Sequence, residues 1–260
     1  MTESLGRWPS APLVYVLAEV RCSPTLDVSG RAAAVQAAIR GQYPLLEPVE
    51  VQTGPAIPGG ASTSIMYSFT DLAKRRGVIV SSGSLCYHAT EYVTSAEFFA
   101  ELGWVLKAVG PIYEQDSVIR LGLRYVDVIV PKENETVFDY VIPSMTGIPL
   151  DASKRVQCVV ELPRVDGGIA VRFMALGSSL ILSPDLLAIS LKRPKWAEEI
   201  LVAGLQSAIL DTDNWNAESR TYDADNLLNA FKGLKKGITE AFLRVASDHA
   251  VQEWKKQRRN

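Results

Sequence analysis

The sequence predicts an α+β fold: a mostly antiparallel, curved sheet covered on one face by two long amphipathic helices. Many short segments are rich in β-branched and aromatic residues, as strands are. Two longer segments, residues 94–113 and 223–242, carry apolar residues at helical spacing. The regular strand–helix alternation of a parallel sheet is absent.

The two long segments share one apolar pattern. When Phe98 is aligned with Leu227, Leu102 falls on Phe231. At 3.6 residues per turn both sets form one stripe, so we expect both helices to pack on the same face of the sheet. An internal duplication explains the match, and so does the general similarity of amphipathic helices. Gly110 and Pro111 should end the first helix near Val109.

The remaining elements follow from local pattern and turn residues. We expect these elements in the first half: a strand at 14–21, a helix capped by Ser29 and ending near Arg40, a loop at 54–60, strands at 64–69 and 77–90, and a helix capped by Ser95. We expect these in the second half: strands at 155–163 and 168–177 joined by a turn, a third strand at 186–192, a helix at 196–206, a strand at 207–215, and a last helix capped by Ser247.

Residues 117–131 form the clearest strand. Alternation places Arg120, Gly122 and Arg124 on one side, and an apolar row on the other. The apolar row consists of Ile119, Leu121, Leu123 and Tyr125.

The chain is expected to form one compact unit with two related halves. Residues 1–11 are polar and read as a disordered N-terminus, residues 12–132 as the first half and residues 133–260 as the second. Hydrophobic residues make up 47% of the chain, which suffices for a sizeable core.

Composition also bears on the compartment. With a net charge of -2, the chain has no overall positive potential that would attract nucleic acid or membranes. The three cysteines are widely spaced and read as reduced core residues. No secretory leader precedes the first strand, and no apolar run approaches the ~20 residues of a membrane span. We therefore expect a soluble, cytoplasmic protein.

Catalytic motifs are absent from the sequence, and we expect no cofactor and no catalytic residue. Cys86 and His88 share one face of a strand; we interpret them as a buried cysteine beside a half-exposed histidine rather than a nucleophile and its base. Asp211 and Asp213 are weak candidates for a divalent-cation site, and their alternative role is to cap or turn the loop before the next helix.

Three residues are candidates for a ligand site or an ion pair. Arg120 and Arg124 flank Gly122 and would leave a small patch for a phosphate or carboxylate. Glu19, inside an apolar strand, needs a partner. We predict that Arg124 pairs with Glu19 and that this side of the strand is at least partly buried.

Two other features are candidates for macromolecular partners. Lys74, Arg75 and Arg76 form a basic cluster that reads either as a solvated face or as a nucleic-acid contact. Trp104 lies away from the apolar stripe of its helix, so it is either a protein-binding anchor or covered by a loop of the same chain.

The strand IRLGLRYVDVI resembles the R-x-G-L-R-Y-x-N signature of a sporadically distributed bacterial family of unknown function. The resemblance extends over nearly the full length, through the opening segment PLVYVLAEVRCSP and the later ILDTDNW. Asp127 stands where the signature has asparagine. The family has no assigned activity, and its sporadic distribution implies a link to mobile-element or defence loci.

Together these observations predict a non-catalytic bacterial binding or interaction module with a protein partner, or a homo-oligomer. The alternative is a nucleic-acid-binding protein with metal-independent nuclease activity.

Overall fold

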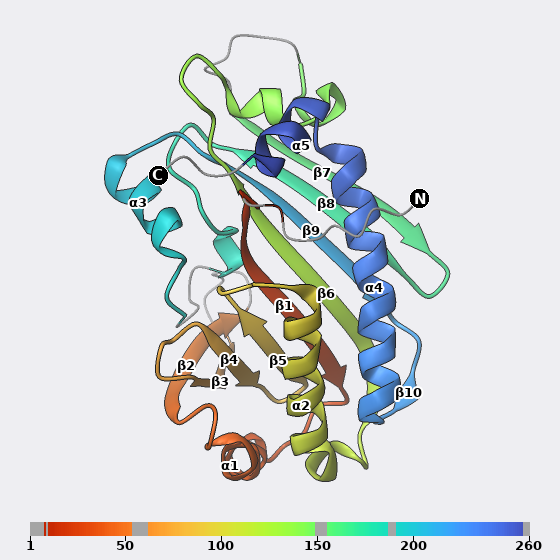
Figure 1. The fold of residues 1–260 in the computed structure, drawn as a ribbon. Coiled ribbons are helices and arrows are strands. Elements are labelled where there is room, and N and C mark those ends of the chain that lie inside the picture. Colours follow the sequence, from red (N-terminus) through yellow and green to blue (C-terminus); the bar gives the residue numbers. More distant parts are fainter. Residues whose placement is uncertain (1–7, 9, 54–61, 149–154, 187–190, 257–260) are drawn as a thin grey trace.

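A computed structural model describes residues 8, 10–53, 62–148, 155–186 and 191–256. Ten strands form one open antiparallel sheet packed against helices (Figure 1). The predicted α+β class is confirmed. The strands are β1 Leu13–Cys22, β2 Leu45–Thr53, β3 Ser62–Thr70, β4 Arg76–Val80, β5 Ser84–Ala89, β6 Ser117–Ile129, β7 Val156–Arg164, β8 Gly167–Ala175, β9 Ala208–Asn216 and β10 Arg220–Thr221. The helices are α1 Val28–Ile39, α2 Ser95–Tyr113, α3 Lys195–Ala203, α4 Ala224–Val245 and α5 Asp248–Lys255, with short 3-10 turns η1 Val137–Tyr140, η2 Pro143–Met145 and η3 Pro184–Leu186.

The strand order reveals a repeated topology. The sheet runs β2-β3-β4-β5-β1-β6-β9-β8-β7, and β10 pairs with β6. In each repeat a first strand (β1 or β6) pairs with the last strand of a three-strand meander (β3-β4-β5 or β7-β8-β9), and a long helix (α2 or α4) follows. This match supports the duplication. It places β6 at the start of the second repeat, whereas the sequence predicts this strand within the first half, residues 12–132.

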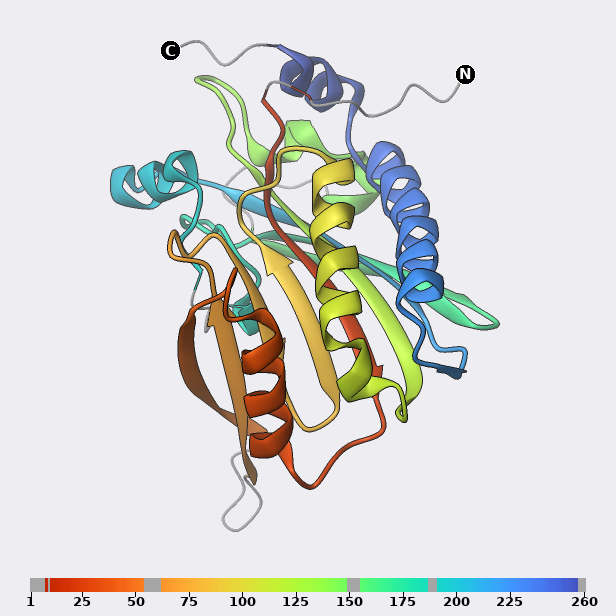
Figure 2. The ribbon, with the colours of Figure 1, turned by 60° about the horizontal axis from the view of Figure 1, so that its bottom comes forward.

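The two long helices lie on the same face of the sheet, as predicted (Figure 2). Phe98 of α2 and Leu227 of α4 belong to one hydrophobic core. Two contacts show that the helices run antiparallel. The hydroxyl of Tyr222, just before α4, donates to the carbonyl of Leu106 in α2 at 2.9 Å. Leu228, further along α4, faces Gly103, which lies one turn before Leu106 in α2. We call the sheet face under α2 and α4 the helical face, and the other the open face.

Several local predictions require correction. Strand β2 is an element that the sequence pattern does not predict; Pro48 and two glutamates interrupt its apolar pattern. The predicted strand at 77–90 is the hairpin β4–β5, which turns between Val80 and Ser84. Helix α2 continues past Pro111 to Tyr113.

The helix caps also differ by one or two positions. Asp27, not Ser29, caps α1 by accepting from the amide of Gly30, and Thr94, not Ser95, caps α2 by accepting from the amide of Glu97. Ser247 caps α5 as expected. The 54–60 loop lies outside the described residues, as does most of the expected strand at 186–192, whose described ends are not in a strand.

A bulge alters the predicted alternation of β6. The pairing with β1 shifts between Arg21 and Cys22, so Val118 enters the core and Ile119 is exposed. Beyond the bulge the prediction holds: Leu121 and Leu123 face the helices.

Three apolar clusters stabilise the fold. The largest lies beneath α1, α2 and the first part of α4, and a second lies between the β7–β9 meander, the rest of α4 and α5. The third covers one end of the open face, where α3 and the turn around η3 pack on Val126 and Val128. No helix in the described part of the chain is both long and apolar enough to cross a membrane.

Candidate functional site

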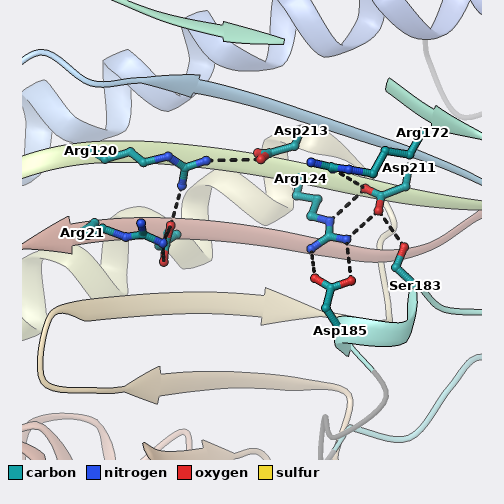
Figure 3. A network of polar contacts seen from close by, with 9 residues as sticks. Arg21, Arg120, Arg124, Arg172, Ser183, Asp185, Asp211 and Asp213 are labelled. Carbon is teal, nitrogen blue, oxygen red and sulfur yellow. Dashed lines mark hydrogen bonds and ion pairs between the residues drawn. The ribbon is translucent and has the colours of Figure 1, made fainter. Parts of the chain in front are cut away.

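The predicted polar residues meet on the open face, where Arg120 of β6 spans two strands (Figure 3). Arg120 Nη1 donates to Glu19 Oε2 at 2.6 Å, and Nη2 donates to Asp213 Oδ2 at 3.2 Å. A Cβ at Gly122 would lie 2.6 Å from Arg120 Nη1, so the glycine lets the guanidinium lie flat on the sheet. The patch expected at Gly122 is therefore covered by Arg120.

Arg124 is held by two carboxylates. Its Nε and Nη2 donate to Asp211 at 2.8 and 2.6 Å, and its Nη1 and Nη2 donate to Asp185 at 2.5 and 3.0 Å. Ser183 donates to Asp211 at 2.6 Å. The predicted partner Glu19 was wrong: it lies beside Gly122 in the β1–β6 register and binds Arg120, while β9 and η3 supply the partners of Arg124. The predicted burial is confirmed, since the side chains of Arg124 and Asp211 are 14% and 0% exposed.

These contacts form two charge-balanced groups on the open face, which we together call the network. One group contains Arg21, Arg120, Glu19 and Asp213, and the other contains Arg124, Arg172, Asp185 and Asp211. Burial lowers the pKa of Arg124, but the hydrogen bonds that it donates to Asp211 and Asp185 outweigh that effect and raise its pKa above the usual value. The arginines therefore satisfy internal carboxylates, which makes the network structural rather than an anion site.

The two weak candidates for a metal site are also part of this network. Asp211 and Asp213 do point to one side of β9, as predicted, but Arg124 and Arg120 bind their oxygens. Among the described residues no group of three or more His, Cys, Asp or Glu side chains is arranged to hold a metal ion.

The basic cluster at the β3–β4 turn is not a continuous free patch. Lys74 pairs with Glu47, and Arg76 lies 3.8 Å from Glu101. Arg75, by contrast, has no ion pair with any described residue, and it lines the cavity considered below.

Trp104 is covered by its own chain. Its ring packs against Tyr43, which follows α1, at a centroid distance of 6.3 Å, and it joins the edge of the main core. The structure therefore supports the covered alternative, and Trp104 loses the exposure that a partner-binding anchor would need.

Cys86 and His88 do share the open side of β5, but His88 is fully buried rather than half-exposed. The hydroxyl of Tyr15 lies 3.0 Å from His88 Nδ1. Burial lowers the pKa of His88 to about 3 and raises the pKa of Cys86, which keeps both neutral. They do not form a nucleophile and base.

A cavity of about 500 Å³ lies on the helical face, at the end where α2 begins and α4 approaches α5. It is bounded by β6, by the β5–α2 connection, by the segment before β1 and by the start of α3 (these elements can be followed in Figure 1). Its lining includes Trp8, Leu13, Arg75, Thr90, Glu91, Tyr92, Thr94, Ser95, Tyr125, Asp127, Trp196, Lys235, Ile238, Thr239 and Phe242.

Asp127 of β6 is less exposed than the other acidic and basic residues described in this lining. The alternation of β6 turns Tyr125, Asp127 and Ile129 to the helical face, and the side chain of Asp127 reaches the cavity. Asp127 is 5% exposed, and no hydrogen bond or ion pair joins it to any residue that the structure describes. Burial, with the charge of Asp211 as a smaller cause, raises its pKa to about 8.

Two tyrosines form the wall beside Asp127. The hydroxyls of Tyr92 and Tyr125 lie 3.1 Å apart, and their rings meet edge to face at 5.7 Å. Burial raises the pKa of both hydroxyls, and the charge of Asp127 raises them further. Both groups are therefore protonated near neutral pH and act as hydrogen-bond donors and acceptors.

The cavity has one buried acidic residue, Asp127, and two basic residues in its lining. Arg75 and Lys235 are half-buried and have no ion pair within the described part of the chain, while Glu91 is exposed. The arrangement can hold a small molecule by charge, by hydroxyl hydrogen bonds and by aromatic contact.

Sequence reasoning singled out none of these groups as a site except Arg75, and Asp127 was noted only as a departure from the R-x-G-L-R-Y-x-N signature. The sequence does contain a signal for Asp127. It is a lone carboxylate in the apolar run VDVIV, and strand alternation places it on the same side as Leu123 and Tyr125. The rule that a charge in an apolar strand needs a partner, applied to Glu19, applies equally to Asp127.

Comparison with family models, curated proteins and solved structures gave no match to the chain. The resemblance to a sporadically distributed bacterial family therefore stays a prediction. The candidate site depends on geometry alone.

Proposed function

We propose that this protein is a non-catalytic binding module that holds a small organic ligand in the cavity between β6, α2 and α4. One observation carries the proposal: a buried carboxyl, Asp127, faces a cavity without a partner among the described residues. Burying such a group costs stability, and the fold gains nothing from it in return. Costs of this kind persist where a binding site uses them.

The chemistry of the lining supports binding rather than catalysis. Its polar groups are hydroxyls, two carboxyls and two cations, and no cysteine or histidine is found among the described lining residues. The tyrosine hydroxyls are protonated, as argued above, which makes them poor nucleophiles. Nothing in this set pairs a nucleophile with a base.

Filling the cavity tests this function. Thr239 lies on α4 and lines the cavity, so Thr239→Trp should occupy the ligand volume. Lys236→Trp is the matched control, because Lys236 is exposed on the same helix outside the lining. In saturation-transfer NMR with a fragment library of mixed charge, we expect fragments that bind the native protein and Lys236→Trp but not Thr239→Trp. A library without binders, or one bound equally by all three proteins, contradicts the proposal.

Nucleic-acid binding is the second candidate, favoured by one observation. Lys232, Lys235 and Lys236 of α4 have no ion pair with described residues, and Lys235 lines the cavity together with Arg75. Their number is small, and the net charge of the chain is -2.

For this second candidate we expect weak binding, no tighter than ~10⁻⁴–10⁻⁶ M at physiological salt. Filter binding with single-stranded RNA and duplex DNA at two salt concentrations measures it. Nanomolar affinity that falls steeply with salt, and that is lost in Lys232→Ala/Lys236→Ala, would favour nucleic acid over a small ligand.

A further inference from the structure

The surroundings of Asp127 indicate which ligand the cavity takes. A carboxyl buried without a partner is stabilised by a proton or by a positively charged donor, and an apolar or anionic ligand supplies neither. The chain itself supplies no cation to Asp127 from the residues described. The complementary group is therefore a protonated nitrogen on the ligand, which takes the place of the proton that Asp127 holds when no ligand is bound. That proton leaves to solvent when the ligand binds.

The walls around Asp127 fit the same group. Tyr92 and Tyr125 stand beside it, and the outer lining adds the indole of Trp8 against Phe242, with ring centroids 5.8 Å apart. Aromatic faces attract ammonium and guanidinium ions through the ring quadrupole. Aromatic walls with a carboxyl at the end are a usual arrangement for recognising an organic cation.

The basic residues of the lining add a second requirement. Arg75 and Lys235 would repel a ligand that carried positive charge alone, and each lacks an ion pair within the described residues. An anionic group on the ligand would pair with them. A cavity of about 500 Å³ accommodates a molecule with both groups a few bonds apart.

We propose that the cavity binds a small zwitterion of the amino-acid type, with its protonated nitrogen against Asp127 and its carboxylate against Arg75 and Lys235. This inference rests on the proposed function and narrows it to one ligand class. The aromatic walls favour a ligand whose body is apolar or aromatic.

Three probes that share one phenylethyl group test the charge pattern: phenylalanine, 2-phenylethylamine and 3-phenylpropionic acid. They carry both charges, the positive charge alone and the negative charge alone. Saturation-transfer titrations with the native full-length protein should give the tightest binding for phenylalanine, weaker binding for the amine and the weakest for the acid.

Two variants assign the result to Asp127. In Asp127→Asn we expect phenylalanine and the amine to lose about tenfold or more in affinity, as when a charge-assisted hydrogen bond is lost. The acid should bind the variant no worse than the native protein. Asp225→Asn removes an exposed carboxylate of α4 that lies outside the cavity lining, and it should leave all three affinities unchanged.

The outcomes separate this inference from the function beneath it. The zwitterion inference is overturned if the acid binds tightest, or if Asp127→Asn leaves the affinity for the amine unchanged. In that case, fragments that bind the native protein but not Thr239→Trp would still support the cavity as a binding site. If phenylalanine and the amine do not bind at millimolar concentration, the inference fails. A fragment screen that finds no binder in the cavity contradicts the proposed binding function as well.

Discussion

Arg124→Ala is expected to lower the free energy of unfolding by about 3–5 kcal/mol, the cost of removing one partner from a buried ion pair. Asp211 is fully buried, and two of its hydrogen bonds come from Arg124. Without the guanidinium, Asp211 retains the hydroxyl of Ser183 and an Arg172 nitrogen 4.0 Å away, so its charge is poorly compensated. Urea unfolding of the native protein and the variant measures the difference.

Two controls separate lost charge pairing from lost volume. Arg21→Ala removes an arginine of the same network whose side chain is 50% exposed, and it should cost at most about 1 kcal/mol. The double variant Arg124→Met/Asp211→Leu replaces the pair with apolar groups and should recover much of the loss. If Arg124→Ala unfolds at the same urea concentration as the native protein, the network does not stabilise the fold.

Asp127→Asn is expected to stabilise the protein increasingly as the pH rises. The pKa of Asp127 is raised in the folded chain, from an ordinary 3.8 to about 8. Between these values the folded state binds a proton that the unfolded state has released, so the free energy of unfolding falls as pH increases. The slope is about 1.4 kcal/mol per pH unit for one group. The amide of the variant does not titrate and escapes this loss.

The measurement is the free energy of unfolding of both proteins at intervals from pH 4 to pH 8. The two should be most similar near pH 4, where the carboxyl is protonated in the folded state and still partly protonated in the unfolded state, and the variant should be more stable by several kcal/mol near pH 8. Asp225→Asn is the control, since that carboxylate is exposed on α4 and its removal should give no such divergence. Parallel curves for native protein and Asp127→Asn would show that Asp127 is solvated or paired.

Much of the fold could be predicted because its signals are local. The apolar stripes of α2 and α4, the alternation of β6 and the turn between β7 and β8 each depend on a few neighbouring residues. The missed features are set by tertiary packing. The bulge opposite Cys22 that exposes Ile119 depends on the pairing of β1 with β6, and the passage of α2 through Pro111 depends on the core that holds the last turn at Tyr113.

The candidate site was predicted less well for the same reason. The sequence marked Glu19 as a residue that needs a partner, and Arg120 and Arg124 as candidates for a ligand site or an ion pair. The structure places all three in ion pairs. It could not show that η3 brings Asp185 to Arg124, because that contact joins residues far apart in the chain. The cavity is formed by segments far apart in the chain that come together around Asp127. The hydrophobic periodicity of the sequence predicts single helices and strands, but it does not predict which of them lie next to each other.

The position of β1 has a consequence for how the protein is made. This strand precedes every other strand in the chain, yet it lies in the middle of the sheet between β5 and β6. A ribosome that has just released residues 13–22 must add more than one hundred further residues before β6 is complete. During that time β1 presents an unpaired edge, which is the kind of surface that chaperones protect and that aggregation exploits. The first repeat therefore keeps one edge of β1 unpaired until the opening strand of the second repeat is made.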